Sequence, residues 1–168
     1  MINTALIIVL HWTASGYSPN ITDLNHYHYL ITGQGRVIKG FHSIEDNFNC
    51  YDGNYAAHID EGNTNTIGIA MCGMYEFKNR EEVGKYPLTK KQVEKCFLLT
   101  SQLMKKYNIP LSNVTTHYHF GLKHPNTLNA GKIDIIYLPP YPAIRTNRIL
   151  EFIQKKVYWY YLNKNDEL

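Results

Sequence analysis

Apolar and polar residues in the first half of the chain follow patterns that predict β-strands. Residues 5–11, ALIIVLH, form a continuous apolar run rich in branched side chains, which is typical of a central strand buried on both faces. Residues 66–73, TIGIAMCG, predict a second apolar strand. Residues 26–40, HYHYLITGQGRVIKG, alternate on either side of a turn at Gly33 to Gly35, so this segment predicts a hairpin.

The clearest helix in the sequence follows the segment KYPLT. Thr89, with Gln92 three residues later, is the sequence signature of a capping box. Apolar residues then recur at spacings of three and four up to Tyr107, and Pro110 ends the pattern. We therefore predict a helix that begins after Thr89 and buries one face.

The last third of the chain mixes a short strand, loops and a second helix. Residues 112–117, SNVTTH, predict a fourth short strand, and the segment 121–142 is rich in loop-forming residues. Residues 146–162 predict an amphipathic helix with Thr146 or Asn147 as its N-cap. Strands interleaved with helices indicate an α/β fold, with a central mixed β-sheet flanked by α-helices.

The length and composition fit one domain that spans residues 1–168. Apolar residues make up 44% of the chain and charged residues 18%, which is a globular composition. The formal net charge of +3 is too small to indicate nucleic acid, although it suits a polyanionic surface such as a bacterial cell wall. The three cysteines have an odd count and no CxxC spacing, so we expect free thiols.

The first apolar run is interpreted as a strand. It has no basic start, is short, and leads directly into a polar motif at His11, which differs from both a signal peptide and a membrane span. We therefore expect synthesis in the cytoplasm without a signal peptide, and no membrane partner.

Three residues could form a metal site. His11 ends an apolar strand, His117 ends another, and Asp134 follows Lys132 by two positions in a stretch of small residues. Catalytic zinc takes three protein ligands from His, Cys or carboxylates and leaves the fourth position open. Because the chain has eight histidines, many such triples are possible, and spacing alone does not select this one.

Five segments together resemble a known family. IIVLHWTAS, YHYLITGQGRVIKG, AAHIDEGNTNTIGIAMCG, VTTHYHF and AGKID occur in the order and approximate spacing found in type 2 N-acetylmuramoyl-L-alanine amidases, which include phage lysozymes of the amidase class and are related to peptidoglycan recognition proteins. The resemblance covers about residues 5–140. It implies a mixed sheet flanked by helices, one catalytic zinc ion, and hydrolysis of the amide bond between N-acetylmuramic acid and L-alanine in peptidoglycan.

The resemblance also assigns roles to individual residues. It implies His11, His117 and Asp134 as zinc ligands and Lys132 as the cation that stabilises the oxyanion. For proton handling, some family members use a Glu, whose position here is Ala70, and others use a Tyr, which Tyr27 matches. Because the pKa of tyrosine is about 10, Tyr27 is expected to position water or donate a proton in the transition state.

Further residues are candidates for substrate binding. His58 matches a family histidine near the cleft, with a surface position as the equal alternative, and Asn65 is expected to shape the same edge. His119 alternates with Tyr118 on the strand and therefore shares a side with His117, where it is expected to line the cleft or support the ligand.

Two further histidines are weaker candidates for a catalytic or metal-binding role. His28 is expected to be structural. His124 lies in a segment that is longer than in compact phage enzymes, which makes it the rival of Asp134 as a ligand, but we interpret it as a loop residue.

The sequence thus predicts a zinc-dependent peptidoglycan amidase, acting as a phage endolysin or a bacterial cell-wall enzyme. We expect a monomer with peptidoglycan or muropeptides as its partner, acting at the cell wall after delivery by an unknown route. Two alternatives stay open: a non-catalytic peptidoglycan-binding module, and an amidase effector used against competing bacteria.

Overall fold

The computed structural model describes residues 6–164, which form a five-stranded sheet in the order β3-β2-β4-β1-β5. The strands are β1 (Ile7–Trp12), β2 (Tyr29–Ile31), β3 (Val37–Lys39), β4 (Thr66–Met71) and β5 (Val114–Thr116). β1 pairs in parallel with both β4 and β5, β2 pairs in parallel with β4, and only β3 is antiparallel to its neighbour. The mixed sheet confirms the predicted fold class.

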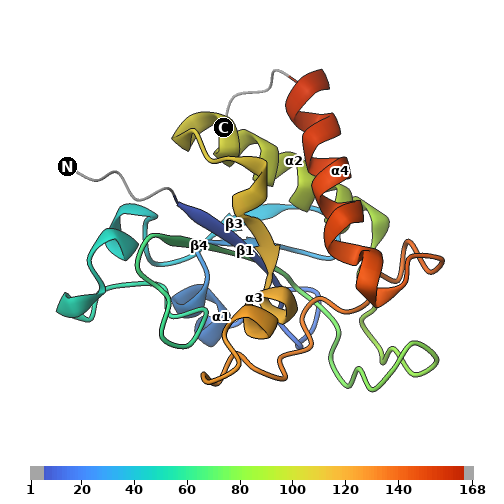
Figure 1. Ribbon diagram of the computed structural model, residues 1–168. Coiled ribbons are helices and arrows are strands. Elements are labelled where there is room, and N and C mark those ends of the chain that lie inside the picture. Colours follow the sequence, from blue (N-terminus) through green and yellow to red (C-terminus); the bar gives the residue numbers. More distant parts are fainter. Residues whose placement is uncertain (1–5, 165–168) are drawn as a thin grey trace.

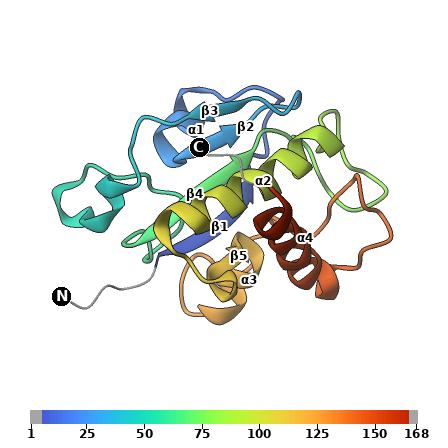
Figure 2. The same cartoon turned by 90° about the horizontal axis from the view of Figure 1, so that it is seen from above.

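Four α-helices surround this sheet: α1 (Ile21–His26), α2 (Lys90–Tyr107), α3 (His117–Lys123) and α4 (Ile149–Asn163). Short 3-10 turns lie at Glu45–Phe48, Cys50–Asp52, Leu111–Asn113 and Thr146–Arg148. α2 and α4 lie together on one side of the sheet, whereas α1 and α3 lie below it in Figure 1. Seen from above, α2 crosses the sheet with α4 beside it, α1 lies near β2, and α3 lies near β5 (Figure 2).

The two central strands form the middle of the core. Every residue of β4 is buried, as is every residue of β1 from Ile8 onward. Continuous apolar runs are typical of strands covered on both faces, which confirms the prediction of a buried central strand from residues 5–11 and agrees with the apolar strand predicted from residues 66–73. Within 5–11, Ala5 lies outside the described residues.

α2 begins and ends where the sequence predicts. The Thr89 side chain accepts from the Gln92 backbone N–H, and the Gln92 side chain accepts from the Thr89 N–H, so the capping box is present. Asn108 ends the helix in the left-handed conformation, two residues before Pro110.

Other boundaries differ from the sequence prediction. α1 occupies the start of the predicted hairpin, so the strand begins at Tyr29 and Tyr27 caps the helix. α4 begins at Ile149, after a 3-10 turn, and no side chain caps it, so the predicted cap at Thr146 or Asn147 is wrong.

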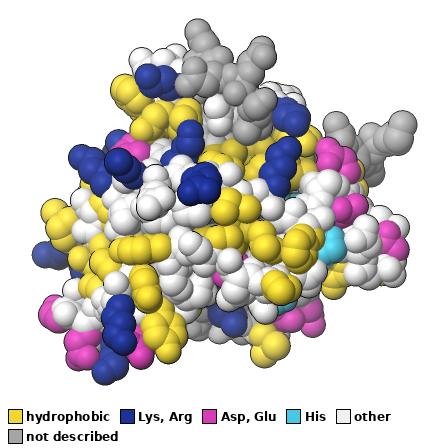
Figure 3. Space-filling view, turned by 180° about the vertical axis from the view of Figure 1, so that it is seen from behind, with side chains coloured by type: hydrophobic (Ala, Val, Ile, Leu, Met, Phe, Trp, Pro, Cys, Tyr) yellow, Lys and Arg dark blue, Asp and Glu magenta, His cyan; other side chains and the backbone are white. Residues whose placement is uncertain are grey.

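One face of the molecule carries its positive charge in a dispersed form. On the face seen from behind, Lys and Arg side chains are spread among apolar ones (Figure 3). Within residues 6–164, no helix combines the length and the apolar character that crossing a membrane requires.

Candidate metal centre

Strand direction brings the two histidines together. His11 lies near the carboxyl end of β1, and His117 directly follows β5. Because these strands are parallel and Leu10 pairs with Thr116, their carboxyl ends meet at the same edge of the sheet. The two imidazole rings are 4.7 Å apart between centroids.

Asp134 reaches the same point from the loop that follows α3. Its Oδ2 lies 2.8 Å from Nδ1 of His11 and 3.2 Å from Nδ1 of His117. The backbone holds the loop there, because the Tyr118 N–H donates to the Asp134 carbonyl at 2.7 Å. Candidate ligand atoms of these three residues all lie within 4.8 Å of one another.

Burial sets the charge state of this cluster. His11 is fully buried, and His117 and Asp134 are 7% and 9% exposed. Burial lowers the pKa of His11 despite the neighbouring carboxylate. Burial alone would raise the pKa of Asp134, but the adjoining His11 and His117 rings together outweigh it, and the net pKa is lowered.

The remaining ring nitrogens of both histidines are held by further residues. Nε2 of His117 is 2.9 Å from Oδ1 of Asn129, and Nε2 of His11 is 3.1 Å from Nδ1 of His58. Metal-binding histidines characteristically have their second nitrogen held in this way. Two inward nitrogens and one carboxylate oxygen therefore fit the three protein ligands that a catalytic zinc ion takes.

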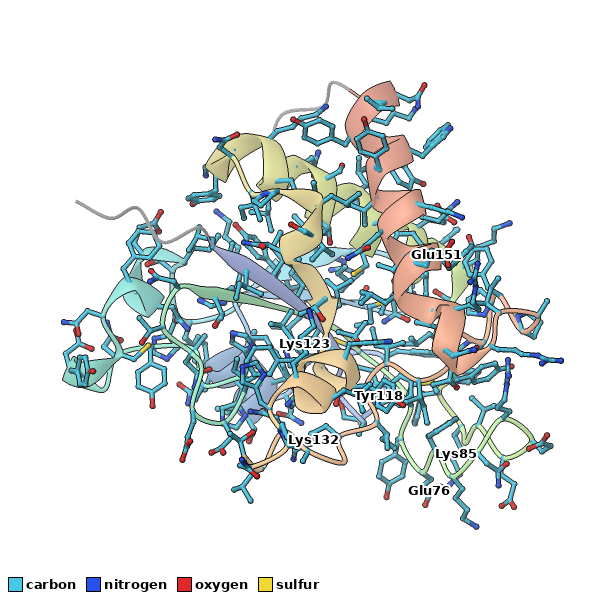
Figure 4. The ribbon with its side chains drawn as sticks, in the orientation of Figure 1. Glu76, Lys85, Tyr118, Lys123, Lys132 and Glu151 are labelled. Carbon is cyan, nitrogen blue, oxygen red and sulfur yellow. The ribbon has the colours of Figure 1, made fainter. Side chains whose placement is uncertain are left out.

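A cleft of about 480 Å³ opens beside this cluster. Its walls include Trp12, Tyr27, Glu76, Phe77 and Lys132, in addition to His117 and Asp134. Figure 4 shows Lys132 in the loop that passes below α3 and Glu76 in a separate loop.

Tyr27 and Lys132 occupy different depths of this cleft. The Tyr27 ring centroid is 5.0 Å from that of His11, and burial raises the pKa of its hydroxyl, so the group stays protonated at neutral pH. Lys132 is exposed, and its positive charge is among the influences that lower the pKa of His11. The structure thus places both predicted catalytic residues around the predicted ligands.

The three residues predicted to bind substrate are not among those that line this cleft. His58 is 5% exposed and sits behind His11, where its Nε2 lies 3.0 Å from Oγ1 of Thr66. Asn65 precedes β4, at the amino end of a strand parallel to β1 and away from the edge that carries His11, and its role in substrate binding stays a prediction.

His119 requires a correction. Thr116 caps α3 at His117, so the segment is helical where a strand was predicted. Successive residues of a helix are separated by about 100°, which places His119 on nearly the opposite side from His117. Its Nδ1 lies 2.7 Å from Oγ1 of Thr116. Substrate contact by His58 or His119 stays a prediction.

The two competing histidines have structural surroundings. His28 accepts from the Gly68 N–H through Nδ1 and lies 3.0 Å from Asn47 Oδ1 through Nε2, and burial lowers its pKa to about 4. His124 caps α3, stacks on Phe120 at 4.0 Å between ring centroids, and is not part of the cluster.

Sequence reasoning missed Asn129 and Thr66. Asn129 is fully buried and Thr66 is 2% exposed, yet Asn129 lies among turn-forming residues and Thr66 stands where such a segment meets the predicted strand 66–73. Asn and Thr are ordinary at such positions, so the sequence carries no signal that separates them from common turn residues.

Comparison with known proteins extends these observations. The sequence profile of the N-acetylmuramoyl-L-alanine amidase family matches residues 3–133, which includes His11, His117 and Lys132 and stops one residue before Asp134. A search of curated protein sequences finds no match.

Solved structures share the fold at low sequence identity. The N-acetylmuramoyl-L-alanine amidase LysC from Clostridium intestinale URNW has a TM-score of 0.54 and 18% identity, over 90% of this chain and 83% of that one. A point mutant of PlyL has a TM-score of 0.52 and 21% identity, over 92% and 85%. The PlyG catalytic domain has a TM-score of 0.52 and 18% identity, over 98% and 88%. With the profile match covering most of the chain, the protein belongs to the type 2 N-acetylmuramoyl-L-alanine amidase family.

Proposed function

We propose that the protein hydrolyses the amide bond between the lactyl group of N-acetylmuramic acid and L-alanine in peptidoglycan, with one zinc ion held by His11, His117 and Asp134. The observation that carries this proposal is the convergence of candidate ligand atoms from two histidines and one carboxylate within 4.8 Å of one another, beside an open cleft. Family membership supports this amide bond as the one that is hydrolysed.

The three ligands supply a suitable charge. Two neutral imidazoles and one carboxylate leave about one net positive charge on a zinc ion. When bound, the ion acts as a Lewis acid on the scissile carbonyl and lowers the pKa of water.

Lys132 stabilises the negative charge that develops on the carbonyl oxygen. It lies on the cleft wall two residues before Asp134, so the loop that carries the carboxylate also brings an ammonium group to the cleft. A cation near the developing oxyanion lowers the barrier without any change in the ligands.

Tyr27 donates a hydrogen bond in the transition state and orients water. Its raised pKa excludes it as a base at neutral pH, because the phenolate is not populated there. Ala70, at the position where other family members carry a Glu, is fully buried and has no ionisable group. Proton handling in this chain therefore depends on Tyr27 and the cleft.

The test is the chemistry of the products. Zinc-loaded protein should release peptides with free L-alanine amino termini from purified cell walls and leave the glycan chains uncut, as measured by mass spectrometry. H11A and D134A should lose this activity while retaining their far-ultraviolet circular dichroism. Undiminished cleavage by metal-free H11A would contradict the proposal.

The rival function is a non-catalytic peptidoglycan-binding module. The complete set of three candidate ligands favours the enzyme, because a binding module has no need for it. Protein that binds walls but takes up no zinc, and releases no amino termini when zinc is supplied, would support the rival. We propose a monomer that acts at the cell wall, as an endolysin, a cell-wall enzyme or an effector with the same chemistry.

A further inference from the structure

The hydrogen bonds behind the candidate ligands determine which ring nitrogen carries a proton. A neutral imidazole has one N–H and one lone pair, and the partner of each nitrogen selects the tautomer. Only the nitrogen with the lone pair can bind a metal ion. Both Nδ1 atoms face Asp134, so the protons on Nε2 decide whether the site can form.

Asn129 selects the tautomer of His117. Its Oδ1 accepts from the Asp60 N–H at 2.9 Å, and its Nδ2 donates to the Asp60 carbonyl at 2.6 Å. Turning the amide over would set donor against donor and acceptor against acceptor. Oδ1 is therefore the atom that faces His117 Nε2 at 2.9 Å, and it accepts a hydrogen bond from the N–H of that nitrogen.

A longer chain of hydrogen bonds selects the tautomer of His11. The Thr66 hydroxyl donates to the Asn63 carbonyl at 2.8 Å, so its oxygen accepts from His58 Nε2 at 3.0 Å. With its proton on Nε2, neutral His58 accepts through Nδ1 from His11 Nε2 at 3.1 Å. His11 Nδ1 is then left with a lone pair.

Both networks have the same outcome. Two lone pairs and one carboxylate oxygen face one another with no hydrogen between them, which is unfavourable without a cation. We infer that His58 and Asn129 are positioning residues, which hold His11 and His117 with the proton on Nε2 and thereby present both Nδ1 atoms to a divalent cation. This inference rests on the proposed metal site and gives His58 a role other than substrate contact.

The buried surroundings make these residues effective. Asn129 is fully buried, and its side chain donates to the Asp60 carbonyl; His58 is 5% exposed, and its backbone N–H donates to the Asn63 side chain. A side chain added at Gly68 would meet the His58 ring at 2.6 Å, so the ring is packed directly against β4. Water cannot easily replace either acceptor.

One spectroscopic measurement and one binding measurement test the inference. In metal-free wild-type protein with ¹⁵N-labelled histidine, long-range ¹H–¹⁵N spectra should show His11 and His117 protonated on Nε2. Zinc affinity, measured in competition with a chromophoric chelator, should fall about 10- to 100-fold in H58F and in N129L. The tautomer should change at His11 in H58F and at His117 in N129L.

Matched variants separate positioning from general damage. H58N keeps an oxygen acceptor near the place of Nδ1 and should bind zinc within about threefold of wild type. N113L loses a hydrogen bond from the Asn113 side chain to the Leu6 carbonyl, at the end of β5 far from the metal centre. It should also bind zinc within about threefold of wild type. The wild-type spectrum gives a result even if a variant fails to fold.

Three outcomes would overturn the inference: wild-type rings protonated on Nδ1, unchanged zinc affinity in both H58F and N129L, or a raised KM in H58F with unchanged zinc affinity, which would assign His58 to substrate. Wild-type protein that shows Nε2 protons and binds zinc, yet releases no L-alanine termini, would contradict only the proposed function.

Discussion

Lys132 and Asp134 are separated by one residue but have different surroundings and different proposed roles. Asp134 is nearly buried and contacts both candidate imidazoles, whereas Lys132 is exposed on the cleft wall. In the proposed function, the carboxylate belongs to the ligand set, and the ammonium group acts on the substrate. The two roles can therefore be separated by substitution.

Replacing Lys132 should impair catalysis without affecting the metal. We expect K132M to lower kcat about 10²- to 10³-fold, the range found when one oxyanion donor is removed. Zinc affinity should stay unchanged, because Lys132 is not a ligand. K123M, which removes an exposed lysine at the end of α3, is the control and should keep full activity. Equal loss of zinc in K132M would contradict this assignment.

His28 should make the stability of the protein depend on pH. Its pKa is about 4 in the folded state and about 6.5 in an unfolded chain, so the unfolded state takes up a proton first as the pH falls. The stability gained by keeping His28 neutral is complete above pH 6.5 and is lost as the pH falls toward 4. The total effect is roughly 3 kcal/mol.

Urea unfolding of metal-free protein at pH 7 and pH 4.5 measures this effect. H28Q should lose less of its unfolding free energy between these pH values than wild type. H26Q, at a partly exposed histidine, should follow the wild-type slope. An H28Q slope equal to that of wild type would show that His28 is not the source.

Among the elements, α2 is joined to the sheet by a buried polar side chain. Gln92 is fully buried, and its Nε2 donates to the carbonyls of Ile31 and Cys72, both at 2.7 Å. The same side chain completes the capping box with Thr89. One residue thus starts the helix and fixes it against the ends of β2 and β4.

Replacing Gln92 with leucine should therefore be costly. Two buried carbonyl groups lose a donor, and each such loss costs about 1–3 kcal/mol. We expect Q92L to lower the unfolding free energy by roughly 2–4 kcal/mol in urea titrations. K95A, one helical turn later and exposed, should change it by less than about 0.5 kcal/mol. Near-wild-type stability of Q92L would contradict this role of Gln92.

The length of an element decided how well the sequence could predict it. β1, β4 and α2 have enough residues for a continuous apolar run or a 3.6-residue period to be visible. α1 and α3 have six and seven residues, too few for such a period. Their only sequence signals are caps, Asn20 with Asp23 and Thr116, and these are also common in turns.

The site was predictable only in part for a similar reason. His11 and His117 could be placed at strand ends from the apolar pattern, but Asp134 was selected by family resemblance because it lies in a loop. The residues behind the candidate ligands include Asn129 and Thr66. Asn129 contacts Asp60, 69 positions away, and Thr66 contacts His58, 8 positions away across a turn. Such contacts leave no local pattern in a sequence.

In the molecule as a whole, α4 completes the core although it lies beyond the matched family region of residues 3–133. Ile149, Ile153 and Val157, spaced four residues apart, are fully buried. Glu94 of α2 bonds Tyr160 at 2.6 Å and Lys156 at 2.8 Å. α4 therefore supports the sheet from the side away from the metal centre.

Weakening this contact should destabilise the fold and leave the site intact. I153A should lower the unfolding free energy by about 2–5 kcal/mol because it leaves a cavity. K155A, which removes an exposed ion pair with Glu151 on the same helix, should cost less than about 1 kcal/mol. Zinc affinity at a temperature where both variants are folded should match wild type; a large loss in I153A would show that α4 helps to build the site.

Amide hydrolysis by this protein is proposed to depend on one zinc ion at His11, His117 and Asp134. A titration of chelator-treated protein with zinc measures this dependence, when bound metal and the rate of release of L-alanine amino termini are followed together. Both should rise in parallel and saturate at one equivalent, and D134A should show neither. Full cleavage without zinc, or a D134A protein that binds zinc and cuts like wild type, would contradict the proposed metal centre.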